Sequence, residues 1–147
     1  MSFKMSDKMR GFCNSINNNT ESGKLDYWDV YYFSSIIGMT KNKCGNKEEL
    51  TEFSKQYVAN YQSLRHTIVA MLITAELNRT GQDFKKDNIT SAFKRLVDEG
   101  SSLILNSTGL STLDGYAEGG FQLISERGGR ITDRIQFLRM CRELINE

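Results

Sequence analysis

The residues with the clearest potential for chemistry gather near the end of the chain, where five of its nine arginines fall within residues 127–142. They are Arg127, Arg130, Arg134, Arg139 and Arg142. Asp133 is the only acid between them, so this stretch carries a net charge of +4. A guanidinium group offers a planar set of N–H donors that suits phosphate or carboxylate. The stretch predicts either contact with nucleic-acid phosphates or, as the commoner alternative, a solvated face with ion pairs to nearby acids.

A glycine-rich segment lies just before these arginines, and its residues 111–130 hold five of the twelve glycines. The spacing of its apolar residues nevertheless predicts a helix that ends at the Gly128-Gly129 pair. Gly115 and Gly119 lie four residues apart on one face, with Tyr116 and Gly120 beside them. Glycine inside a helix costs roughly 1 kcal/mol relative to alanine. We therefore predict a face for close approach, by another helix of the chain, a partner chain or a ligand.

Two acids share this predicted helix, Asp114 and Glu118, which are also four residues apart. Paired carboxylates can do acid–base work or bind a hard cation, and with Tyr116 and Arg130 they could form an enzyme site. Solvated surface acids are far commoner. The one histidine, His66, stands outside any Cys/His cluster and has no obvious nucleophile to activate. The sequence therefore favours a non-enzymatic role and predicts no catalytic residue, metal or cofactor.

Composition narrows the class of protein. The three cysteines are widely spaced and fit neither a disulfide framework nor a zinc pattern, so we predict reduced thiols in a cytoplasmic protein. Residues 1–10 are mixed and charged, unlike a secretory signal, and the longest apolar run, residues 68–73, is too short to span a bilayer. The net charge of +1 gives no global field that would attract nucleic acid or anionic lipid.

The elements that must position these residues are predicted to be helices. The chain contains no proline, where roughly seven would be expected at this length, and proline is the strongest helix breaker. Apolar spacing predicts helices over residues 3–16, 25–39, 47–80 and 88–100, then the glycine-rich helix from Ser111 and a last helix capped by Thr132. Residues 25–39 could alternatively form a buried strand. Residues 101–109 fit either a helix or a strand.

The longest predicted helix, over about residues 47–80, has the most regular pattern in the chain. Its apolar residues recur about every 3.6 positions, at Leu50, Phe53, Tyr57, Tyr61, Leu64, Ile68, Leu72 and Ala75. Such a helix would be about 50 Å long, whereas a compact domain of this size is about 40 Å across. It must either break, near residues 60–63, or project and meet a partner.

These patterns predict an all-α protein, a single domain over residues 1–147 built as a bundle of about five to six helices around one long central helix. We expect it to act by protein–protein association, as a homo-oligomer or as a subunit of a larger assembly. One alternative is a nucleic-acid-associated protein that uses the arginine-rich region. The other is an enzyme with a site between Asp114 and Arg130.

Overall fold

A computed structural model describes residues 1–18, 23–127 and 131–147 of the chain. These residues form seven helices and one two-stranded sheet, so the predicted helical class is confirmed, with a small sheet added to it. In chain order the elements are β1 (Phe3–Met5), α1 (Asp7–Asn17), α2 (Tyr27–Lys41), β2 (Thr51–Ser54), α3 (Ala59–Gln62), α4 (Arg65–Arg79), α5 (Lys86–Leu96), α6 (Ser107–Glu126) and α7 (Arg134–Asn146). Within the described ranges, no helix combines the length and the apolar character needed to cross a membrane.

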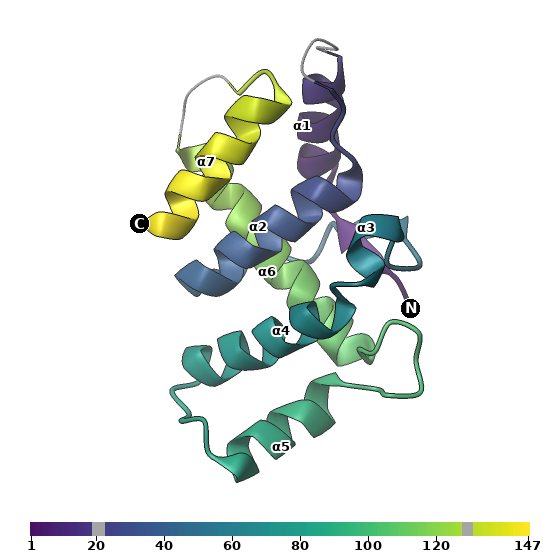
Figure 1. Ribbon diagram of the computed structural model, residues 1–147, viewed down its shortest axis with the longest axis vertical. Helices are drawn as coiled ribbons and strands as arrows, with labels where there is room; N and C mark the ends of the chain where they lie inside the picture. The colour runs from purple at the N-terminus through teal and green to yellow at the C-terminus, as the bar shows by residue number, and fades with distance from the viewer. Residues whose placement is uncertain (19–22, 128–130) are drawn as a thin grey trace.

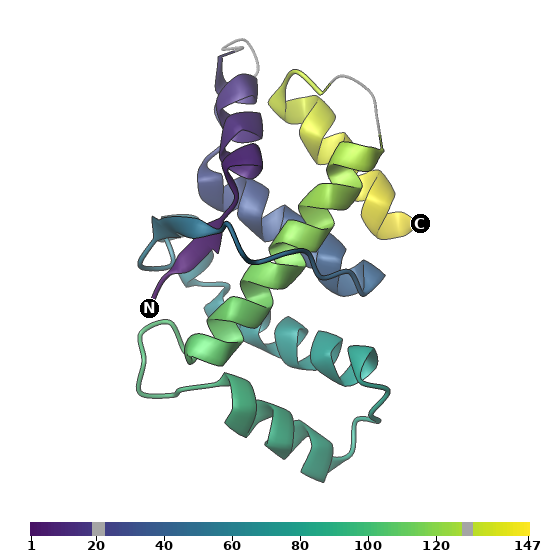
Figure 2. The ribbon, with the colours of Figure 1, turned by 180° about the vertical axis from the view of Figure 1, so that it is seen from behind.

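The glycine-rich helix α6 runs through the middle of the molecule and crosses α2, its most extensive neighbour (Figure 1). Helices α1 and α7 lie toward one end of α6, and α4 and α5 lie toward the other. Seen from behind, the extended chain between α2 and β2 passes over α6 (Figure 2). At 20 residues α6 is the longest described helix, so it takes the central place predicted for residues 47–80.

Helix α2 is a helix rather than the alternative strand because its first turn is well capped. The backbone N–H of Asp26 donates to the carboxylate of Asp29 at 2.8 Å, as in a capping box. Its aromatic residues pack into the core: the rings of Trp28 and Tyr31 are buried and contact the ring of Phe3 on β1. The apolar surface of these rings therefore holds β1 against α2.

Residues 47–80 do not form one continuous helix, because this segment forms β2, α3 and α4 in succession; the break predicted near residues 60–63 lies between α3 and α4. β2 pairs antiparallel with β1, which satisfies backbone groups that a helix would have bonded internally. Most of the regular apolar residues still reach the core, but from several elements: Phe53 from β2, Tyr61 from α3, and Ile68, Leu72 and Ala75 from α4. The Tyr57 hydroxyl donates to the Leu103 carbonyl at 2.8 Å, and the Tyr61 hydroxyl donates to the Asp29 carboxylate.

Several helices also start at other residues than predicted; α5, for example, starts at Lys86 rather than at residue 88. The first helix starts at Asp7 rather than residue 3, because residues 3–5 form β1. Helix α6 starts at residue 107, before the predicted Ser111, because the side chain of Asn106 caps it by accepting from the Gly109 N–H at 2.9 Å. Helix α7 is capped by Asp133 rather than Thr132, through the Gln136 N–H at 2.8 Å.

Residues 101–109, which fit either a helix or a strand, do not form one continuous element of either kind. They begin as a turn, continue through an isolated bridge between Val97 and Leu105, and end in the first turn of α6. Helix α5 ends at Leu96, before the predicted stop at Gly100.

Candidate functional site

Helix α6 buries three polar side chains that point to two different sides. Asp114, Tyr116 and Glu118 are 4%, 0% and 8% exposed. Residues four apart share a helix face, whereas residues two apart lie on opposite sides. Asp114 and Glu118 therefore face one way, and Tyr116 faces the other. We call these two sides the acid side and the tyrosine side of α6.

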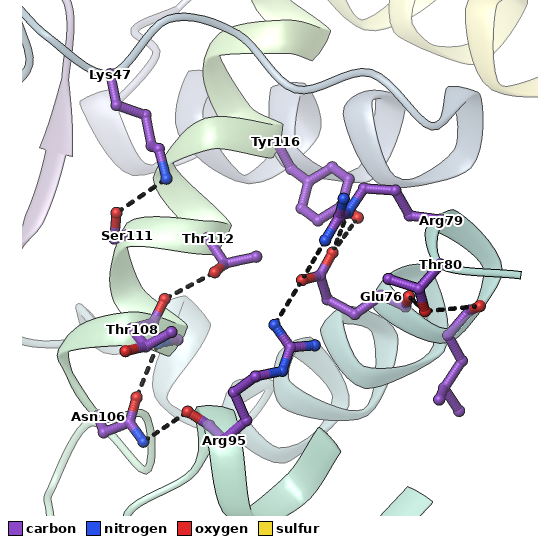
Figure 3. Close-up of polar contacts among 12 residues, drawn as sticks. Lys47, Glu76, Arg79, Thr80, Arg95, Asn106, Thr108, Ser111, Thr112 and Tyr116 are labelled. Atoms are coloured by element: carbon purple, nitrogen blue, oxygen red, sulfur yellow. Dashed lines mark hydrogen bonds and ion pairs between the residues drawn. The ribbon is translucent and has the colours of Figure 1, made fainter. Parts of the chain in front are cut away.

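On the tyrosine side a buried glutamate, Glu76 of α4, receives donors from three elements (Figure 3). The Tyr116 hydroxyl donates to Glu76 Oε2 at 2.7 Å. Arg79 donates to both carboxylate oxygens, with its Nε 2.7 Å from Oε2, and Arg95 of α5 donates to Oε1 at 3.2 Å. We call these four residues the Glu76 network. It ties α4, α5 and α6 together.

The Glu76 network holds its carboxylate ionised. Burial alone would raise the pKa of Glu76, but the hydrogen bonds from Arg79, Tyr116 and Arg95 outweigh burial and lower that pKa to about 2. The same pairing raises the pKa of Arg79. A carboxylate with such a low pKa is a poor proton acceptor near neutral pH. The network is therefore suited to holding helices together.

On the acid side, Asp114 accepts hydrogen bonds from two segments that pack on α6. The Tyr31 hydroxyl of α2 donates to Asp114 Oδ1 at 2.7 Å, and the backbone N–H of Lys4 on β1 donates to the same atom at 3.1 Å. Burial raises the pKa of Asp114 to about 6, although both hydrogen bonds act in the opposite direction. Asp114 thus links β1, α2 and α6 through a carboxylate that titrates in mildly acidic solution.

Glu118, one turn further along α6, has fewer partners. Its Oε2 atom is buried and has no hydrogen-bond partner. Burial raises the pKa of Glu118, and the Ser6 hydroxyl and the Lys8 charge oppose this only in part. A buried polar atom without a partner is uncommon in proteins and calls for an explanation.

Two adjacent hollows lie on the acid side. One, of about 350 Å³, is lined by Asp114 together with Lys4, Lys47 and Ser111. The other, of about 310 Å³, is lined by Glu118 together with acidic residues described below. Both include Glu48 and Leu50, from the chain just before β2, in their walls.

The enzyme site predicted between Asp114 and Arg130 is divided in the structure. Asp114 and Glu118 lie on the acid side, whereas Tyr116 donates to Glu76 on the other side. Arg130 lies outside the described residues. Within the described ranges, no group of three histidine, cysteine or acidic side chains is placed to hold a metal ion.

The glycine face of α6 lies against other parts of the same chain. A Cβ atom at Gly120 would sit 1.7 Å from the Ser34 carbonyl oxygen of α2, and one at Gly119 would sit 2.1 Å from the Lys43 carbonyl oxygen. The Gly115 carbonyl accepts from the backbone N–H of Gly45 at 2.8 Å. The face predicted from Gly115, Gly119, Gly120 and Tyr116 is thus covered by α2 and by the chain that follows it.

The predicted arginines fall into separate places. Arg127, Arg139 and Arg142 line one hollow of about 650 Å³ between the end of α6 and α7, together with Glu143 and Glu147. Arg127 forms an ion pair with the Glu147 side chain. Arg134 lies at the start of α7, near Gly23, and Arg130 lies outside the described residues.

Sequence reasoning missed the Glu76 network and the glycine opposite α6. Glu76 continues the apolar series of Ile68 and Leu72 at steps of four, so an acid on a buried helix face was a visible signal. Gly38 stands within the aromatic-rich α2, and a Cβ atom there would lie 1.9 Å from the Tyr116 carbonyl oxygen. A glycine inside such a helix was likewise a visible sign of close contact.

No protein-family model, curated protein or solved structure matches this chain.

Proposed function

We propose that the protein acts by binding a partner protein through helix α5. The observation that carries this proposal is a set of exposed apolar residues, Phe84 just before α5 and Ile89 and Phe93 one helical turn apart on it, which we call the α5 surface. These side chains are 55%, 38% and 36% exposed, and they are three of the five large hydrophobic residues exposed in the described part of the chain. Scattered apolar residues on a surface are ordinary, whereas several in one short segment favour a contact site.

The position of α5 supports this role. The helix buries only Ala92 and Leu96. Arg95 is fixed by Glu76, and the Asn106 side chain donates to the Arg95 carbonyl at 3.0 Å (Figure 3). A surface held in place before binding loses less conformational entropy when a partner arrives.

The charges around this surface indicate the chemistry of the partner. Lys86 and Lys94 lie on α5 with a single acid, Asp87, whereas Arg95 is paired with Glu76, and Lys85, before the helix, is paired with Asp83. Oppositely charged rims steer association and reject wrong partners. We expect the partner to present apolar side chains surrounded by carboxylates.

A Phe93→Asp variant tests this proposal. The charge should abolish association, because an aspartate would be desolvated in the interface. The matched control is Ile135→Asp, which places the same charge on another exposed apolar residue, 58% exposed on α7. Sedimentation of the purified protein tests whether the partner is a second copy of the chain. Other partner proteins are tested by capture from an extract of the source cells, after which each candidate is purified and its binding is measured. Association that both variants retain would contradict the proposal, as would a protein that stays monomeric and captures nothing.

A second candidate function, nucleic-acid association, is supported by the shared hollow of Arg127, Arg139 and Arg142. Phosphate binding should weaken steeply with salt. We expect an Arg139→Ala/Arg142→Ala variant to lose binding to labelled DNA or RNA in fluorescence anisotropy at low salt. Lys24→Ala/Lys55→Ala removes the same charge from exposed residues elsewhere and should retain binding. Equal binding by the two variants would contradict this candidate.

A further inference from the structure

The hollow beside Glu118 combines strong negative charge with an unpaired buried oxygen. Its wall contains four carboxylates, from Asp7, Glu48, Glu49 and Glu118, and one ammonium group, from Lys8. These residues come from the start of α1, from the chain before β2 and from the middle of α6, which Figure 2 shows meeting on one side of the molecule. The acids are thus gathered by the fold.

Glu118 distinguishes this hollow from an ordinary acidic surface. Asp7, Glu48 and Glu49 are exposed and can be solvated, but Glu118 is only 8% exposed and its Oε2 has no partner. A buried carboxylate oxygen without a donor carries a desolvation penalty that a cationic donor would relieve. Glu118 lines the hollow and is 8% exposed, but its Oε2 atom has almost no exposed surface, so a donor in the hollow reaches that oxygen only if the carboxylate turns toward it.

We propose that this hollow binds an organic cation with N–H donors, an alkylammonium or guanidinium group, through Glu118 with Asp7, Glu48 and Glu49 around it. A bare metal ion fits the residues less well. Hard cations need several converging oxygens, and no group of three potential ligands within the described ranges is placed to supply them. The volume of about 310 Å³ suits the end of a small amine or one side chain.

The cation could belong to a free small molecule or to a lysine or arginine side chain of a peptide. Both sources present the same donors to Glu118. A charge-assisted hydrogen bond to a carboxylate is stronger than a neutral one. The proposed cation site on the acid side of α6 does not depend on partner binding at the α5 surface. Either proposal can therefore fail without the other.

Titration of the isotope-labelled full chain, followed by NMR, tests this site. The test ligands are agmatine, a capped arginine tripeptide and tetramethylammonium, a cation that lacks N–H donors. We expect agmatine or the tripeptide to shift the amide signals of residues 6–8, 46–50 and 118, and tetramethylammonium to shift them at least tenfold more weakly. The ligand that binds more tightly identifies the source as a free molecule or a peptide.

Variants decide whether Glu118 is responsible. Glu118→Gln should weaken binding at least tenfold, whereas Glu126→Gln, an exposed glutamate of the same helix, should leave binding unchanged. Glu49→Gln changes an exposed residue and should weaken binding severalfold without affecting folding, so it keeps the test valid if Glu118→Gln unfolds. The proposal is overturned if no ligand binds at millimolar concentration, if tetramethylammonium binds equally well, or if Glu118→Gln or Glu49→Gln folds and binds like the unmodified chain.

Discussion

The two sides of helix α6 handle buried carboxylates in opposite ways. On the tyrosine side, Glu76 is paired with two guanidinium groups and one hydroxyl, and its pKa falls to about 2. On the acid side, Asp114 has one hydroxyl and one backbone N–H, and burial raises its pKa to about 6. Burial is common to both sides, so the donors decide whether a carboxylate stays ionised down to low pH or titrates in mildly acidic solution.

The largest expected effect comes from removing the helix crossing on which both sides depend. In Gly120→Ala the new Cβ atom would lie 1.7 Å from the Ser34 carbonyl oxygen and 2.7 Å from the Gly38 nitrogen. Backbone atoms cannot move aside unless α2 and α6 separate, so we expect a loss of more than about 4 kcal/mol or no folding. Circular dichroism and urea unfolding measure this.

Gly11→Ala is the matched control for that variant. Gly11 lies inside α1, and a Cβ atom there would meet nothing within 4 Å. Alanine should stabilise this helix by about 0.5–1 kcal/mol. A Gly120→Ala variant that is as stable as the unmodified chain would show that the crossing is not as close as described.

Replacing each glutamate by glutamine contrasts the two sides directly. Glu76→Gln removes a buried charge that two arginines share, and we expect it to lower the free energy of unfolding by about 3 kcal/mol. Glu118→Gln removes a charge whose burial the Ser6 hydroxyl and the Lys8 charge offset only in part, and we expect a change within about 1 kcal/mol or a slight gain. Urea unfolding at pH 7 compares the two. Equal decreases in the free energy of unfolding would contradict the proposed difference between the two sides of α6.

The pH dependence of stability sharpens the contrast. Between its ordinary value of 3.8 and its folded value of about 6, Asp114 binds more protons in the folded state. The free energy of unfolding should therefore fall as pH rises from about 4 to 7, by roughly 2–3 kcal/mol at about 1.4 kcal/mol per pKa unit. Glu118, whose pKa is also raised, contributes in the same direction.

Asp114→Asn should remove most of that fall, which urea unfolding at several pH values would measure. Glu76 acts in the opposite direction and in a lower window: its contribution is present above its ordinary pKa of 4.5 and is lost as pH falls toward 2. An Asp114→Asn variant with the same pH profile as the unmodified chain would contradict the assignment of Asp114.

The smallest expected effects come from removing one tyrosine hydroxyl on each side of α6. Tyr116→Phe leaves Glu76 with two arginines, and we expect a loss of about 1 kcal/mol with a modest rise in the pKa of Glu76, because the Tyr116 hydroxyl helps to lower that pKa. Tyr31→Phe leaves Asp114 with only the Lys4 N–H, and we expect a larger loss of about 2 kcal/mol and a further rise in the pKa of Asp114. NMR titration of the carboxyl groups measures both pKa values. A larger rise at Glu76 would reverse the comparison.

The sequence predicted element type well where the local signals agreed. Helices α2 and α6 follow from their apolar spacing and from capping residues, although Asn106 rather than Ser111 caps α6. The predicted helix was wrong over residues 47–64, where apolar residues recur at helical spacing but Thr51–Ser54 pairs with β1. Local periodicity cannot reveal a partner strand that lies about fifty residues away in the chain.

The candidate site was only partly predictable for the same reason. The four-residue spacing placed Asp114 and Glu118 on one face, and the two-residue step to Tyr116 already implied the other face. Nothing in the order of residues indicated that Arg95 would reach Glu76 across nineteen positions, or that Asp7 and Glu48 would flank Glu118. Contacts between such distant residues depend on how the helices pack.

By itself, the sequence determined that this protein is mainly helical and that a glycine-rich helix has to be approached closely, because helical spacing and the energetic cost of glycine are local properties. The tertiary structure alone decided what approaches that helix and which charges gather beside it. The reason is physical: the protonation and pairing of a buried carboxylate depend on the donors that packing brings within about 3 Å, and those donors come from distant parts of the chain.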